Sequence, residues 1–457
     1  MRSLTAVSSF LIVLLHPALL GAQAIGAQLD SAMHAAEANG FSGVVRVERD
    51  GVILLRKGYG LANRATHMQF APATVVQIGS NTKDFTAVAI LQLARQGRLS
   101  LRDSLGKFFP APADKRGITI SQLLEHRAGF PLGLGGDFEP VTRAALVDSA
   151  MRVRLPFVPG ARESYSNTGY SLLAAIIEQV TNRSYDEHIR DAILTPLGLR
   201  HTGFLLPAFA ASDLAHGYLA GGADAGTMLG QPHAPDGPWW NLRGNGGMLS
   251  TVDDMHAFYR ALFESDSLLP RAGRGSRFNP DEPVGLAGSD GVNFFLYERD
   301  PQSHTEIIIA STNVELKAPL IRRALGELLG LPNPDVDAGS VAHRPGGTPA
   351  PAPMAALLAQ LIECMNSGDT AQVRRYVEAH FVIEPGTPAL EVRVQRISGM
   401  RERLGVLQIL GIETFADGPV EVRLRSTLQE GVLLRVAMDR VAPYAIHGVQ
   451  VQIGGPN

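Results

Sequence analysis

The sequence predicts an α/β domain followed by a small α+β domain, and three observations carry this prediction. Strand-like segments lie near both ends of the first 330 residues, with mainly helical sequence between them. Residues 332–353 are rich in Pro, Gly, Asp, Ser and Ala and lack apolar periodicity, which is typical of a linker. The last hundred residues place helical patterns before strand-like runs, as a separate α+β domain does.

The length and composition exclude several classes of protein. The chain has 457 residues, of which 45% are hydrophobic and 19% charged, so two folded units with ample cores are expected. A net charge of −3 provides no basic stripe for nucleic acid and no polybasic segment for anionic lipid, so a nucleic-acid partner is not expected. The single cysteine, Cys364, follows apolar residues at helical spacing and is predicted to be a buried structural thiol.

The N-terminus has the pattern of a signal peptide. Arg2 precedes a mostly apolar stretch from Leu4 to Leu20, and small residues follow up to Ala24. We therefore expect residues 1–24 to be removed and the mature protein to be periplasmic or secreted, without stable membrane insertion and without a cysteine for lipidation. The alternative is an N-terminal anchor helix, but Ser, His and Pro interrupt the run.

The first domain, residues 25–331, is predicted to combine a sheet from both of its ends with a helical lobe. Its first elements are expected to be two strands in a hairpin, Ser42 to Tyr59, with a tight turn at Asp50-Gly51. The sequence is helical and rich in loops from Asp84 to about Gln179. The remaining expected elements are a helix starting near Ser250-Thr251, strands at 292–297 and 306–310 joined by a 298–303 loop, and a helix at 319–329.

The second domain, residues 354–457, has the pattern of helices followed by an antiparallel sheet. Helices are expected at 354–366 and 370–381, with a third after them, and strands at 404–414, 420–428, 432–439 and 445–453. This outline resembles the nuclear-transport-factor-2-like superfamily. No catalytic constellation is found in this domain.

Ser80-Asn81-Thr82-Lys83 is the most informative motif of the chain. It follows the strand-like run 74–79 and precedes apolar residues at helical spacing, so Ser80 is expected at or near a helix N-terminus. Ser80 and Lys83 then share one face of the helix. A lysine removes the proton of a serine hydroxyl only if burial or positive surroundings lower its pKa.

Further motifs follow S-x-x-K in a fixed order. They are Leu123 to Pro131 (LLEHRAGFP), Tyr165-Ser166-Asn167 before a helical segment, Pro196 to Leu199 with Thr202, and Gly246 to Thr251 (GGMLST). In this order they resemble the serine beta-lactamase-related family, peptidase family S12, with its class C beta-lactamases, D-Ala-D-Ala carboxypeptidases, D-aminopeptidases and esterases. The resemblance covers about residues 40 to 315 and implies a beta-lactamase/transpeptidase-like α/β fold.

The resemblance also implies roles for individual residues. Ser80 would be the acylated nucleophile, Lys83 its proton acceptor and Tyr165 a second acid-base group. Asn167 would orient Lys83 and contact a substrate amide. Independently of the family, Tyr165 can act as a phenolate near neutral pH only beside a cation, and Lys83 is the only candidate in these motifs. The backbone N–H of Ser80 is the first expected oxyanion donor.

The third family motif departs from the usual pattern. Where the family places K-T-G or H-x-G on a strand facing the nucleophile, this chain has Gly285 to Gly291 (GLAGSDG), with Leu286 in place of Lys or His. Gly288 is retained, and the N–H of Ser289 falls where the second oxyanion donor is expected. The side-chain cation that helps to bind a substrate carboxylate is lost. An ester or an uncharged amide is therefore a better candidate substrate than a penicillin.

These observations predict an exported serine hydrolase that forms an acyl-enzyme on Ser80 and hydrolyses a small ester or amide, or a peptidoglycan-like compound. No metal or organic cofactor is expected, since the histidines lack the spacing of metal ligands. One alternative is a degenerate member that binds a cell-wall fragment without turnover. Another places the function in the C-terminal domain. The oligomeric state, and whether Trp239 and Trp240 line the cleft or the core, are open at this stage.

Overall fold

A computed structural model describes the chain in ten segments. They are residues 17–205, 208–219, 222–290, 292–312, 317–331, 348–382, 390–414, 419–428, 432–439 and 441–453. Residues 1–16 of the predicted signal peptide and residues 332–347 of the predicted linker lie outside them.

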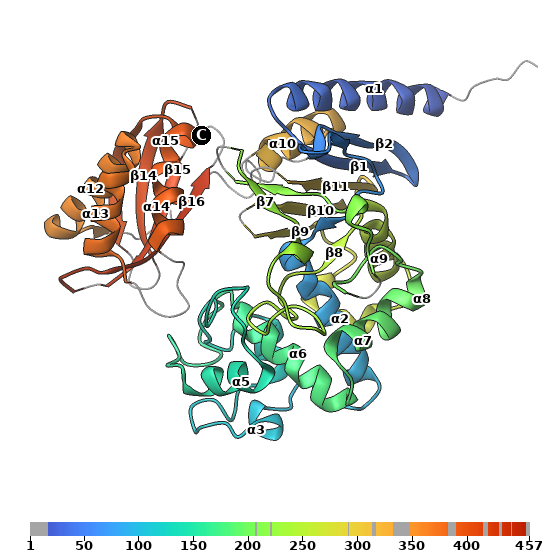
Figure 1. Ribbon diagram of the computed structural model, residues 1–457, viewed down its shortest axis with the longest axis horizontal. Coiled ribbons are helices and arrows are strands. Elements are labelled where there is room, and N and C mark those ends of the chain that lie inside the picture. Colours follow the sequence, from blue (N-terminus) through green and yellow to red (C-terminus); the bar gives the residue numbers. More distant parts are fainter. Residues whose placement is uncertain are drawn as a thin grey trace, which may run out of the picture.

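The first domain is built on a five-stranded antiparallel sheet in the order β2-β1-β11-β10-β9 (Figure 1). Its strands are β1 (Gly43–Arg49), β2 (Val52–Tyr59), β9 (Val284–Ser289), β10 (Phe294–Asp300) and β11 (Thr305–Ser311). Gly43 pairs with Ser311 and Arg49 with Thr305, so strands from both ends of the domain lie side by side, as predicted. The hairpin turn is also confirmed: Asp50 and Gly51 both have positive φ, which two-residue hairpin loops favour.

Side chains alternate between the two faces of this sheet. On one face, Val45, Val47, Ile307 and Ile309 contact α1 (Pro17–Ala38) and α10 (Lys317–Leu329), which lie together above the sheet in Figure 1. On the other face, Val44, Ile308 and Ala310 belong to the main core, together with α9 (Val252–Glu264). Both faces are therefore covered by helices.

Helix α1 corrects the expectation that the mature chain opens with two strands. Its residues Leu29 and Met33 are fully buried against the sheet, and Ile25 and Ala36 pack beside them. The helix passes through the predicted cleavage point after Ala24 without a break. Within the described residues, no helix is both long and apolar enough to cross a membrane.

Two strands of the sheet, β10 and β9, also differ from the expected elements. β10 continues to Asp300 and so takes in the first half of the predicted 298–303 loop. The charged side chains there have partners: Glu298 pairs with Arg322 of α10, and the guanidinium of Arg299 lies over Phe263. β9 was not predicted from apolar periodicity, because Gly285 and Gly288 disfavour strands, and only the family resemblance implied a strand here. It is the edge strand next to the nucleophile, and its contacts are described below.

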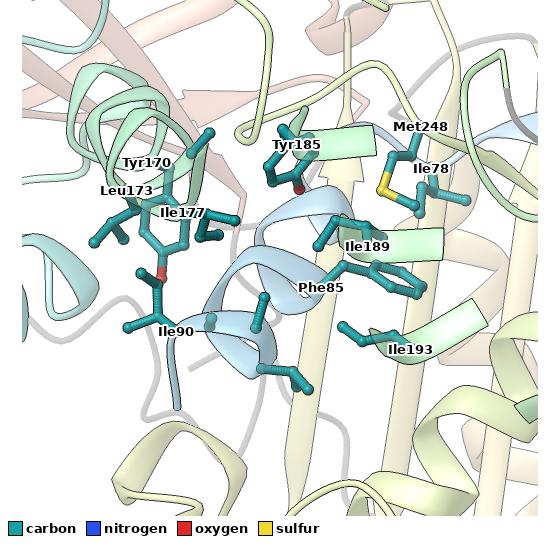
Figure 2. Close-up of a cluster of buried hydrophobic side chains, with 14 of the residues drawn as sticks. Ile78, Phe85, Ile90, Tyr170, Leu173, Ile177, Tyr185, Ile189, Ile193 and Met248 are labelled. Atoms are coloured by element: carbon teal, nitrogen blue, oxygen red, sulfur yellow. The ribbon is translucent and has the colours of Figure 1, made fainter. Parts of the chain in front are cut away.

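The second part of the first domain is the helical lobe. It contains α3 (Leu105–Phe108), α4 (Ile120–Leu124), α5 (Arg143–Arg152), α6 (Asn167–Thr181), α7 (Tyr185–Ile189), the π-helical turn η2 (Arg190–Leu194) and α8 (Thr195–Leu197). Figure 2 shows how this lobe is fixed to α2 (Thr82–Arg95): Phe85 and Ile90 of α2 lie among side chains of α6, α7 and η2. α2 is therefore buried at the junction of sheet and lobe.

Short elements complete the domain. They are β3 (Leu61–Asn63), β4 (Met68–Gln69), β5 (Val76–Gln77), β6 (Gly217–Tyr218), β7 (Asp224–Gly226), β8 (Leu249–Ser250), and the 3₁₀ turns η1 (Gly79–Asn81), η3 (Ala211–Asp213), η4 (Met228–Gly230), η5 (Arg271–Gly273) and η6 (Ser276–Phe278). The predicted cap of α9 is confirmed, since Thr251 Oγ1 accepts a hydrogen bond from Asp254 N at 3.2 Å.

The C-terminal domain has a hydrophobic core of its own. Its sheet runs β12 (Thr348–Pro349), β13 (Leu407–Thr414), β14 (Val420–Ser426), β15 (Val432–Met438) and β16 (Ile446–Ile453). Its helices are α12 (Ala352–Ser367), α13 (Thr370–His380), α14 (Leu390–Ser398) and α15 (Met400–Leu404). The antiparallel α+β prediction is confirmed, and Cys364 is buried in the core as expected. Thr348 and Pro349, expected in the linker, pair with β13.

Candidate active site

Ser80 lies in a short turn that brings a strand, a helix and the edge of the sheet together. β5 pairs with β8, and the following turn η1 runs directly into α2. Gly79 has φ +51, and a Cβ on it would lie 2.5 Å from Ser289 N, so only glycine fits between the turn and β9. The prediction that Ser80 precedes a helix is confirmed.

Lys83 is almost completely buried beneath Ser80. Its Nζ donates hydrogen bonds to Ser80 Oγ at 3.1 Å and to the backbone oxygen of Asn245 at 2.6 Å. Burial, and then the charge of Arg277, hold the pKa of Lys83 well below its usual range, against the opposing charges of Asp84 and Asp137. The neutral amine, which can accept a proton, is favoured.

Tyr165 approaches Ser80 from the helical lobe. Its hydroxyl donates a hydrogen bond to Ser80 Oγ at 2.7 Å, and its ring centroid lies 4.9 Å from Lys83 Nζ. Although the Tyr165 side chain is 45% exposed, partial loss of water raises the pKa of its phenol, whereas the hydrogen bond to Ser80 and the charge of Arg277 lower it. Tyr165 is therefore a proton donor at rest, and the positive charge of Arg277 acts on it in addition to the neighbouring Lys83.

His126 packs against the ring of Tyr165, a contact that the sequence did not indicate. Its ring lies 4.5 Å from the Tyr165 ring, and its Nδ1 accepts a hydrogen bond from Ser166 N at 3.2 Å. Burial, with a contribution from the charge of Arg277, lowers the pKa of His126 to about 4, so the ring is neutral at physiological pH.

Asn167 begins α6, directly after its N-cap residue Ser166. Among the described residues, Lys83 hydrogen bonds to Ser80 and Asn245 and not to Asn167, so orienting Lys83 falls to the Asn245 carbonyl instead. Asn167 Oδ1 is buried without a hydrogen-bond partner in the described part of the chain. The predicted hydrogen bond from the Asn167 side chain to a substrate amide stays a prediction.

The third motif faces the nucleophile through its backbone. A Cβ on Gly288 would lie 2.5 Å from Ser80 N and 2.1 Å from Ile78 O, so β9 and η1 are in direct contact. Ser289 Oγ donates to Asn293 O at 2.7 Å, and the backbone N of Ser289 lies beside Gly79 of η1. Leu286 is 9% exposed and part of the main core, and its carbonyl accepts a hydrogen bond from Asn81 Nδ2.

A buried polar network behind Ser80 was not predicted. Asp84, the residue after Lys83, is fully buried and ion-paired with Arg277 of η6. Tyr259 of α9 donates to Asp84 Oδ2 at 2.7 Å, and Asn81 Nδ2 donates to the Tyr259 hydroxyl at 2.7 Å. Arg277 lies 193 residues after Asp84, and no local pattern in the sequence connects the two.

Of the two neighbouring tryptophans, Trp240 lies in the core of the first domain. Trp240 is 5% exposed within the main core, with the guanidinium of Arg243 5.0 Å from its ring.

The C-terminal domain contains a cavity of about 340 Å³. It is lined by Pro353, Leu357, Ala379, His380, Phe381, Pro443, Tyr444 and Ala445.

A serine, a lysine and a tyrosine meet at the junction of the sheet and the helical lobe. This arrangement is the type of site that serine hydrolases have. A sequence profile of the family described as Beta-lactamase matches residues 29–306. The chain therefore belongs to the beta-lactamase family.

Individual relatives agree with this assignment. "Putative penicillin-binding protein PbpX" of Bacillus subtilis (strain 168) is 29% identical over 265 residues, which are 58% of this chain and 64% of that protein. The chain thus spans less than two thirds of this relative.

Solved structures show the same fold. The D-amino acid amidase from Ochrobactrum anthropi SV3, complexed with L-phenylalanine amide, has a TM-score of 0.55 at 21% identity, covering 67% of this chain and 99% of that one. The octameric penicillin-binding protein homologue from Pyrococcus abyssi has a TM-score of 0.59 at 22% identity and covers 91% of both chains. This second likeness therefore extends into the C-terminal domain.

Proposed function

We propose that this chain hydrolyses a small ester or amide through an acyl-enzyme on Ser80. The observation that carries the proposal is that two side chains donate hydrogen bonds to Ser80 Oγ. They are Lys83, whose pKa is lowered, and Tyr165, whose pKa is raised. One group is suited to accept a proton and the other to donate one, which acyl transfer requires.

The proposed reaction uses each group once per half-reaction. Neutral Lys83 takes the proton of Ser80, and Oγ forms a bond to the acyl carbon while the carbonyl electron pair moves to oxygen. The backbone N–H groups of Ser80 and Ser289 stabilise this oxyanion. As the carbonyl forms again, the bond to the leaving group breaks and the leaving group takes the Tyr165 proton. The Lys83 ammonium returns a proton to Tyr165, and water releases the acyl group by the reverse sequence.

The substrate is proposed to carry no carboxylate near the reacting bond. Leu286 offers an apolar side chain at the position of the family's cation, and Arg277 is already paired with Asp84. Burial, and then the charge of Asp290, raise the pKa of Asp137, so the carboxyl groups of Asp137 and Asp290 lie within range of each other near the site. A neutral ester or amide avoids repulsion by these groups. The amide in the similar Ochrobactrum structure is consistent with this class of substrate.

The second candidate is a binding protein for a cell-wall fragment, and Leu286 is the observation that favours it. The two candidates are separated by intact-protein mass after exposure to a small fluorophosphonate, for wild type and Ser80→Ala in parallel. We expect a single adduct on the wild type only. Absence of an adduct on folded wild-type protein would favour the binding protein.

We also propose export, on the basis of the N-terminal pattern. Cleavage after Ala24 leaves Ile25 to Ala38 of α1, including Leu29 and Met33, which are its fully buried contacts with the sheet. The N-terminal sequence of protein recovered from outside the cytoplasm should begin at Ile25. Recovery of full-length protein from the membrane fraction would instead support the anchor helix.

For the C-terminal domain we propose a nuclear-transport-factor-2-like fold that acts as a binding or assembly module. Helices packed against one antiparallel sheet, with a cavity at His380 and Tyr444, support this assignment.

A further inference from the structure

A buried ion pair lies directly beside the proposed base. Asp84 follows Lys83 on α2 and is fully buried. Arg277 Nε and Nη2 donate to Asp84 Oδ1 at 3.0 and 2.5 Å, and the Tyr259 hydroxyl donates to Oδ2 at 2.7 Å. The carboxylate is thus held by three hydrogen bonds and one positive charge.

The position of this carboxylate is unfavourable for a lysine that must be neutral. The charge of Asp84 raises the pKa of Lys83, so an unpaired Asp84 would stabilise the Lys83 ammonium. A protonated lysine has no lone pair with which to accept the Ser80 proton. Arg277 supplies the compensating charge in the same location.

The other described groups around Lys83 supply no positive charge that would compensate the charge of Asp84. The rings of Tyr165 and Tyr170 lie 4.9 and 5.8 Å from Nζ, and both phenols are neutral because their pKa values are raised. His126 is neutral because its pKa is lowered to about 4. Asp137 adds negative charge, which again favours the ammonium.

We propose that Arg277 is a positioning residue that neutralises Asp84 and thereby keeps Lys83 available as the proton acceptor for Ser80. This inference rests on the proposed function of Ser80 and Lys83. Arg277 enters from η6, whereas the family's usual cation would stand on β9, where this chain has Leu286. The Tyr259–Asn81 hydrogen bonds continue from the ion pair to the Leu286 carbonyl and connect the two locations.

The ionisation of Lys83 can be measured without a substrate. The chain contains five lysines: Lys57, Lys83, Lys107, Lys115 and Lys317. Protein labelled with ¹³C at lysine Cε therefore gives at most five signals, and the signal missing from Lys83→Met assigns the relevant one. Its chemical shift against pH gives the pKa of Lys83.

The charge variants should move this pKa in opposite directions. Arg277→Gln leaves Asp84 unopposed, so the pKa of Lys83 should rise by about one unit or more. Asp84→Asn leaves Arg277 unopposed and should lower it. The double variant removes both charges and should return it close to the wild-type value, as should Arg277→Lys. Arg271→Gln is the matched control, because Arg271 on the neighbouring η5 pairs with Asp281 at the surface.

Two other results would overturn the inference: equal pKa values in all variants, or shifts of the same sign in both single variants. If Arg277→Gln does not fold, Asp84→Asn decides alone, since an unchanged pKa there contradicts the proposal. The rate of Ser80 labelling by a fluorophosphonate should follow the same midpoints. If wild-type Ser80 is not labelled, the proposed function fails, and the Lys83 titration still tests the ion pair.

Discussion

Two proton-bearing groups of opposite tendency meet at Ser80 Oγ. Lys83 is buried and favoured as a neutral amine, whereas Tyr165 keeps its proton and donates it to the serine. The division of roles follows from the environment of each group, because loss of water disfavours both the ammonium and the phenolate.

Tyr165→Phe tests the role of the phenol. The ring can keep its contacts with His126 and Lys83, while the hydrogen bond to Ser80 is lost. Loss of a general acid typically costs about 10²–10⁴-fold in rate, so turnover of a small ester or amide should fall in that range, with little change in KM. The loss should be smaller for an activated ester, whose leaving group needs no proton. Equal losses for both substrates would contradict the role.

For individual site residues, the sequence predicted the contacts between residues that are close together in the chain. Ser80 and Lys83 are one helical turn apart, and a pattern of four residues suffices to bring them together. Asn245 and Arg277 act on Lys83 from segments more than 150 residues away, through a carbonyl and a charge that no motif identifies. The expectation that Lys83 tunes Tyr165 stays a prediction, whereas the charge of Arg277 on Tyr165 was not indicated by any motif.

Among the elements, the contact between β9 and η1 determines the geometry at Ser80. Gly288 allows the strand to approach the turn, and no side chain larger than hydrogen fits there.

Gly288→Ala should separate β9 from η1. The added Cβ meets backbone atoms, which cannot yield as a flexible side chain can, so a loss of stability of about 1–3 kcal/mol is expected. Ser80 labelling should fall more than stability alone explains, because the second oxyanion donor is displaced. Gly285→Ala on the same strand is the control, since its Cβ would meet nothing within 4 Å. Similar labelling of the two variants, measured where both are folded, would contradict this account.

Apolar periodicity did not predict β9 or α1, and each has its own physical cause. β9 contains two glycines that lower its strand propensity, and tertiary contact with η1 and β10 outweighs this. α1 joins a segment that resembles a signal peptide to one with weak apolar spacing, and its burial against the sheet becomes evident only in the fold. The other strands and long helices were predictable because their apolar periodicity is strong.

For the whole molecule, the separate cores of the two domains predict independent folding. A chain that ends at residue 331 should keep the melting transition of the first domain and its rate of Ser80 labelling within about twofold, since the described site residues all precede it. Comparison with the full chain by calorimetry and labelling checks this. Loss of labelling in a folded truncated protein would place part of the function in the C-terminal domain.

The pairing of Gly43 with Ser311 has a consequence for the synthesis of the chain. β1 cannot find its second neighbour until more than 300 residues have left the ribosome, so the sheet closes late and the contact is of very long range. During that interval β1 and β2 form a hairpin with an unpaired apolar edge, which is prone to aggregation. The sheet of this domain should therefore stay incomplete, with β1 exposed, for most of the synthesis of the domain.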